Sequence, residues 1–92
     1  MTEKIIPFDI AEHLKTDEDI RAFLQESAAN ATATEFIHAL NTAARAKGMT
    51  EVAKLAGVSR ASLYKSLSGQ GKPEFATIAK VVEALGCKLV IS

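Results

Sequence analysis

Apolar residues recur at intervals of three and four along most of this 92-residue chain, which is the spacing of one face of an α-helix. The pattern predicts helices, separated by short polar or glycine-containing segments, over residues 10–14, 17–27, 34–47, 51–56, 60–67 and 73–85. Thr16 precedes the second of these, with Asp19 three positions later, an acidic form of the capping box. We interpret the small, polar segment 27–34 as a helix end and a connector.

Residues 49–67 form the most specific pattern in the sequence. Thr50 is expected to cap a first short helix that ends before Gly57, because glycine readily adopts the left-handed conformation common at helix ends. Ser59 is expected to cap the second helix. Two crossed helices would bury the apolar positions between them, which are Val52, Ala53, Ala56, Val58, Leu63 and Leu67. This arrangement is typical of the helix-turn-helix, a motif that binds DNA.

The C-terminal segment 88–91 is short, apolar and rich in β-branched residues, and it predicts a β-strand. A lone strand needs a partner, and no second strand is evident in the sequence. The same strand of a second copy would provide one, so Leu89, Val90 and Ile91 are the predicted interface of a homodimer. We therefore expect an all-α fold, a helix-turn-helix bundle with an N-terminal helical extension and one short C-terminal strand.

The charges are unevenly distributed although the formal net charge is zero. Residues 1–44 hold eight acidic and three basic side chains, whereas residues 45–72 hold six basic side chains against Glu51. A net charge of zero would alone argue against nucleic acid, but the basic excess coincides with the helix-turn-helix pattern. We therefore divide the chain into an acidic N-terminal helical arm, residues 1–31, and a DNA-binding domain, residues 32–92.

The start of the second short helix carries the residues expected to read DNA. A recognition helix contacts base edges through its N-terminal residues. Arg60 is suited to guanine, and Ala61 to the methyl group of thymine. Further contacts to bases or phosphates are expected from Thr50, Ser59, Ser62, Tyr64, Lys65 and Lys72. The alternative is a helical pair in a bundle that does not bind DNA, but it leaves the local basic excess unexplained.

Other kinds of site have little support in the sequence. His13 and His38 lie on separate predicted helices, each without a second ligand at metal-binding spacing. The glycines at residues 69–71 follow a helix rather than a strand, which argues against a nucleotide-binding loop. No nucleophile, base and acid form a catalytic set. We therefore predict a protein that is not an enzyme and needs no metal or cofactor.

The sequence also bears on the compartment. Cys87 is the single cysteine, which excludes an internal disulfide and suits a reducing environment. No apolar run approaches the roughly 20 residues needed to span a bilayer, and the N-terminus lacks the pattern of a signal peptide. A cytoplasmic protein without membrane contacts is expected.

Two motifs carry a resemblance to a known family. They are Ser-Arg-x-x-Leu-Tyr-Lys at residues 59–65 and Gly-x-Pro-x-Phe at residues 71–75, supported by the segments 7–14, 17–20, 43–49 and 84–89. With them the chain resembles, over nearly its whole length, the addiction-module antidote proteins of the lambda-repressor-like superfamily. These are the antitoxins of bacterial toxin–antitoxin pairs. The resemblance implies a cytosolic protein encoded beside a toxin of the RelE/ParE type, which it neutralises. It also implies that the antitoxin, alone or with its toxin, represses the operon.

The acidic arm gains a candidate role from this resemblance. Toxins of that type act on RNA or on DNA and tend to be basic, so an acidic surface would steer association. Apolar contacts to the toxin are expected from Phe8, Leu14, Phe23 and Leu24. The alternative, which we favour for any one of these residues, is that it closes the core. Two further interpretations stay open: a stand-alone transcriptional regulator without a toxin, and a protein-interaction module that has lost DNA binding.

Overall fold

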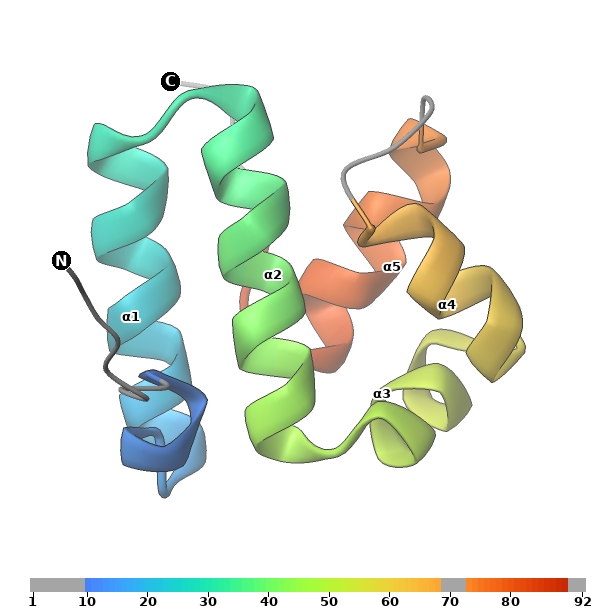
Figure 1. Ribbon diagram of the computed structural model, residues 1–92, viewed down its shortest axis with the longest axis horizontal. Helices are drawn as coiled ribbons and strands as arrows, with labels where there is room; N and C mark the ends of the chain where they lie inside the picture. The colour runs from blue at the N-terminus through green and yellow to red at the C-terminus, as the bar shows by residue number, and fades with distance from the viewer. Residues whose placement is uncertain (1–9, 69–72, 90–92) are drawn as a thin grey trace, which may run out of the picture.

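The computed structural model describes residues 10–68 and 73–89, and within them all regular structure is helical. Helices α1 and α2 stand side by side as an antiparallel pair, while α3 and α4 lie on the other side of α2 and α5 passes behind (Figure 1). The elements in chain order are η1 (Ile10–His13), α1 (Asp17–Asn30), α2 (Ala33–Lys47), α3 (Met49–Ala56), α4 (Arg60–Ser66) and α5 (Phe75–Ala84). The all-α class is confirmed.

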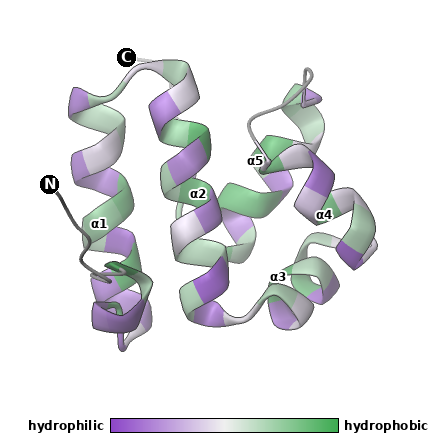
Figure 2. Ribbon diagram, viewed as in Figure 1, coloured by the Kyte–Doolittle hydropathy of each residue, from purple (hydrophilic) through white to green (hydrophobic). Residues whose placement is uncertain are grey.

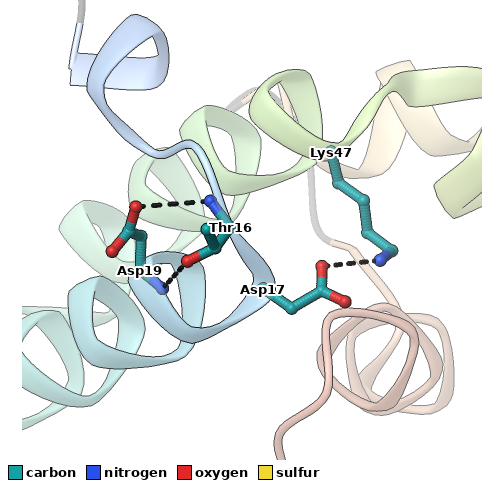
Figure 3. Close-up of polar contacts among 4 residues, drawn as sticks. All are labelled: Thr16, Asp17, Asp19 and Lys47. Atoms are coloured by element: carbon teal, nitrogen blue, oxygen red, sulfur yellow. Dashed lines mark hydrogen bonds and ion pairs between the residues drawn. The ribbon is translucent and has the colours of Figure 1, made fainter.

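Capping boxes fix the starts of the two long helices. The backbone N–H of Asp19 donates to Oγ1 of Thr16 (3.0 Å), and the Asp19 carboxylate accepts from the Thr16 N–H (3.3 Å; Figure 3). Thr32 and Glu35 repeat this exchange at α2, with distances of 3.2 and 2.9 Å. The box at Thr16 confirms the sequence prediction, whereas the box at Thr32 was not anticipated. Each box gives partners to backbone N–H groups that the helix itself leaves unpaired.

Two other helix boundaries differ from the prediction. Helix α1 continues to Asn30 instead of ending near Ser27, because alanine is a strong helix former and the Asn30 side chain donates to the Glu26 carbonyl at 3.0 Å. The connector to α2 is therefore only two residues long. The short helix predicted at residues 10–14 is a 3₁₀-helix over Ile10–His13 with no buried residue.

The prediction that Thr50 caps α3 is wrong. Gly48, with φ of 111°, is both the C-cap of α2, which ends at Lys47, and the N-cap of α3, which begins at Met49. Its N–H donates to the Ala44 carbonyl (2.8 Å) and its carbonyl accepts from Val52 (2.9 Å). Glycine adopts such a φ without steric cost, so the chain turns sharply and α3 begins earlier than a threonine cap would allow. Thr50 lies inside the first turn.

The predicted C-terminal strand is also wrong. Helix α5 is followed by Gly86 with φ of 86°, and the Cys87 N–H donates back to the Val82 carbonyl at 3.0 Å. Residues 87–89 then have no regular structure, and residues 10–68 and 73–89 contain no strand. The reason is physical: an extended segment becomes a strand only by pairing its backbone, and the described part of the chain, which is helical, offers no strand to pair with. Val90 and Ile91 lie outside the described residues.

One apolar core unites all five α-helices. Ile20 and Leu24 of α1 belong to the same cluster as the buried residues of the other helices. Each helix alternates hydrophobic and polar segments along its ribbon, as expected where one face of each helix packs inward (Figure 2). The other core members are Ala39, Leu40, Ala43, Ala44, Met49, Val52, Ala53, Ala56, Leu63, Leu67, Ile78, Val81, Val82 and Leu85. Among the helices of the described residues, none has the length and apolar character that crossing a membrane requires.

Replacing Thr32 or Thr50 by alanine separates a true cap from a residue in the first turn. We expect Thr32→Ala to lower the free energy of unfolding by about 1 kcal/mol, because an N-cap hydrogen bond and its reciprocal partner are lost. The matched control is Thr50→Ala, which removes no cap and should change stability by less than about 0.5 kcal/mol. Urea denaturation followed by circular dichroism measures both. A larger loss at Thr50 would restore it as the cap of α3.

Candidate nucleic-acid interface

The turn between α3 and α4 is built from glycine and serine. Gly57 is left-handed, with φ of 74°, and the Val58 N–H donates to the Ala53 carbonyl at 3.0 Å to close the end of α3. Ser59 then caps α4, its hydroxyl oxygen accepting from the Ser62 N–H at 3.0 Å. Both features confirm the sequence prediction. The turn therefore fixes the direction in which α4 leaves.

Helix α4 is held by its inward face. Leu63 is fully buried and Leu67, just past the helix end, is 1% exposed. The Asn41 amide of α2 also donates to the Leu67 carbonyl at 3.3 Å. These contacts tie α4 to the core and to α2, so the opposite face is presented to solvent.

The exposed face of α4 gathers most of the residues predicted to contact DNA. Six of them are exposed there, namely Ser59, Arg60, Ala61, Ser62, Tyr64 and Lys65. Thr50 is exposed in the first turn of α3, and Lys72 lies outside the described residues. The structure thus brings the predicted set together on one short helix and its cap.

Arg60 and Tyr64 form a pair on this face. The Arg60 Nη2 donates to the Tyr64 hydroxyl oxygen at 3.0 Å. The guanidinium carbon also lies 5.4 Å from the centre of the Tyr64 ring, within the range of a cation–π contact. Both residues were predicted to contact DNA, but their pairing was not predicted, although a spacing of four places them on one helix face.

The positive charge of Arg60 at the start of α4 does not stabilise the helix. The first turn contains Arg60 and no acidic residue. A cation there opposes the helix dipole, whose positive end is at the N-terminus. Arg60 is therefore in an unfavourable position for helix stability, in contrast to α1, where Asp17, Glu18 and Asp19 fill the first turn.

Helix α1 has an acidic excess, with four acidic side chains against one basic side chain, Arg21. Glu18 and Glu26 are exposed, and Asp17 pairs with Lys47 of α2 at 3.0 Å (Figure 3). The Lys47 side chain is 20% exposed and that of Asp17 is 64% exposed. This pair joins the start of α1 to the end of α2, so the Lys47 ammonium has a protein partner. This ion pair was not predicted from the sequence.

The residues predicted to contact a toxin differ in exposure. Leu24 is buried at 2% exposure, while Leu14 and Phe23 are half-buried and pack against the core. These positions fit the alternative that apolar residues of this segment close the core. Phe8 lies outside the described residues.

An apolar groove lies between the starts of α2 and α5. It has a volume of about 390 Å³. Phe75 lines this groove and is 73% exposed. Leu89, a predicted dimer contact, lies in the same groove at 41% exposure. The lining is completed by Ala33, Thr34, Phe36, Ile37, Pro73 and Ile78.

Cys87 is half-buried beside Arg21. Burial raises the pKa of the Cys87 thiol, and the Arg21 guanidinium partly opposes this rise. The thiol therefore stays protonated at neutral pH and is a weak nucleophile. Within residues 10–68 and 73–89, no group of three or more histidine, cysteine or acidic side chains is placed to hold a metal ion.

Comparison with known proteins gives the family. Residues 4–92 match the family described as "probable addiction module antidote protein". The chain is also 43% identical over 91 residues to an uncharacterized protein of Haemophilus influenzae, a match that covers 99% of this chain and 94% of that protein. No solved structure matches. The chain belongs to the addiction module antidote family, which indicates an antitoxin role and a toxin partner and suggests a regulatory protein rather than an enzyme.

Proposed function

We propose that this protein is an antitoxin that binds operator DNA through α3 and α4 as a homodimer and represses its own operon. It neutralises a toxin of the RelE/ParE type by direct contact, in the cytoplasm. The observation that carries the DNA part is the face of α4, where six predicted contact residues are exposed while Leu63 anchors the opposite side in the core. We further infer that α2 to α5 form a lambda-repressor-like domain with a helix-turn-helix at α3 and α4.

The side chains on α4 contact different parts of the DNA according to their chemistry. Arg60 donates to the two acceptors on the major-groove edge of guanine, and Ala61 packs on a thymine methyl group. Ser59 and Ser62 add hydrogen bonds to bases, while Lys65 reaches a base or a phosphate. Phosphate contacts from Thr50 and Lys72 set the position of the helix on the duplex, and Tyr64 lies beside Arg60 at the same interface.

A homodimer follows from how such motifs read DNA. Two recognition helices bind half-sites about 34 Å apart on one side of the duplex, and one copy of this chain supplies a single helix of this kind, α4, in its described residues. Because residues 10–68 and 73–89 contain no strand, the dimer is proposed from this geometry and from the exposed Leu89 side chain.

The toxin-binding part of the proposal rests on the family and on the acidic α1. Residues 1–31 supply the toxin-facing arm, and the exposed carboxylates of Glu18 and Glu26 attract a basic partner. Phe23, half-buried on the same helix, adds apolar contact at the edge of that surface.

Arg60→Ala tests the DNA proposal. We expect a loss of about 1–3 kcal/mol in discrimination at one base position, because one bidentate base contact disappears. Folding stability should change by less than about 0.5 kcal/mol, because Arg60 is exposed. Fluorescence anisotropy with duplexes of the protein's own upstream region, each carrying one base change, measures the preference.

The matched control for Arg60→Ala is Lys80→Ala, which removes the same charge from an exposed position on α5. It should leave the base preference unchanged. An unaltered preference in Arg60→Ala would remove Arg60 from base reading. The endpoint of the titration also gives the stoichiometry, where two chains per operator support the homodimer and one chain contradicts it.

Neutralising Glu18 and Glu26 together by glutamine tests the toxin-facing surface. We expect association with the product of the adjacent reading frame to slow by about 2- to 10-fold at low salt, because electrostatic steering is weakened. Stopped-flow fluorescence with a labelled partner measures the rate. Glu74→Gln, an exposed acid at the start of α5, is the control and should have little effect. Equal slowing by both variants would place the partner elsewhere, and no complex at all would refute this partner.

A further inference from the structure

Tyr64 is exposed yet doubly engaged with Arg60. Its hydroxyl accepts from Arg60 Nη2 at 3.0 Å, and the guanidinium carbon lies 5.4 Å from the ring centre. Tyr64 keeps 44% of its surface exposed and belongs to no core cluster. The contact therefore does little for packing. Its consequence is conformational: a long, flexible arginine side chain is held along the surface of α4.

From this geometry we propose that Tyr64 is a positioning residue for Arg60, which it orients before DNA arrives. The inference rests on the proposed function, because it assumes that Arg60 reads a base. An arginine carries five N–H donors, and only one is used on the phenol. The remaining donors suffice for the two acceptors of guanine. The arginine thus loses less freedom on binding, and the loss of freedom on binding is a main cost of recognition by flexible side chains.

A second role for Tyr64 makes different predictions. If Tyr64 acts only as an independent phosphate contact, its removal weakens binding to every sequence equally and lowers the salt dependence of binding. If it positions Arg60, its removal acts on the base that Arg60 reads. The two effects of removing Tyr64 and Arg60 are then not additive, because both act through one contact.

The pair can first be observed without DNA. Tyr64 is the only tyrosine, and the chain has no tryptophan, so ultraviolet-excited emission reports on this side chain. We expect Arg60→Ala to change the tyrosine emission of the free protein. The control is Lys65→Ala, which removes a neighbouring cation of the same helix that is not the partner of the phenol. Unchanged emission in Arg60→Ala would overturn the inference, whatever the DNA result.

The decisive variant is Tyr64→Phe, which keeps the ring and removes the hydroxyl. We expect discrimination at the base read by Arg60 to fall about 2- to 10-fold, with other positions unaffected, as preorganisation of one side chain is lost. Tyr64→Leu, which also removes the ring, should lose more. The double variant with Arg60→Ala should be no worse at that base than Arg60→Ala alone. Anisotropy with the same set of single-base duplexes measures all three.

The outcomes separate this inference from the function on which it rests. If Arg60→Ala loses the base preference and Tyr64→Phe keeps it, positioning is wrong and DNA reading stands. A uniform loss over all sequences in Tyr64→Phe assigns the hydroxyl to phosphate and also overturns the inference. If the unaltered protein has no base preference, both the proposed function and the inference fail.

Discussion

The arrangement of this protein depends on the burial of Leu63 and Leu67. Helix α4 has seven residues, far too few to persist alone in water, since isolated helices need roughly 12–15 residues to be even marginally stable. It exists because two leucines insert into a core shared with the other helices and because Ser59 caps its start. The exposed set from Ser59 to Lys65 is presented only as long as those leucines stay buried.

The same constraint explains the contrast between the two ends of the molecule. Helix α1 follows the usual rules for a stable helix, with a capping box and acids in its first turn. Helix α4 has a cap but carries a cation in its first turn, against the dipole. Because α4 forms through tertiary packing, its exposed side chains need not be the ones that stabilise an isolated helix. The unfavourable position of Arg60 and its pairing with Tyr64 are consistent with the proposal that this surface contacts DNA.

Much of this fold is readable from local sequence rules, and the errors have identifiable causes. Helices α2 to α5 begin and end within two residues of the predicted bounds, because apolar spacing and glycine stops act locally. The prediction for Thr50 was wrong because Gly48, two residues earlier, is the N-cap of α3. The φ angle that gives Gly48 this role cannot be read from the hydrophobic pattern. The prediction of a C-terminal strand was wrong because a strand forms only with a partner, and a local sequence pattern does not show whether a partner exists. Phe75 stands three positions before the buried Ile78, at the spacing of one helix face, yet it is exposed, because only the assembled helices decide which apolar residues are covered.

The sequence could predict which residues are exposed on α4, but it could not predict the contacts between them. Spacing on a helix put the α4 residues on one face, but the hydrogen bond from Arg60 to Tyr64 depends on rotamers that spacing leaves open. The most direct test of the account is the affinity of the full chain for its own upstream DNA relative to a scrambled duplex of equal length and composition. At about 0.15 M salt, a specific regulator should prefer its own site by roughly 10³-fold or more. Equal affinities for the two duplexes would contradict sequence-specific repression.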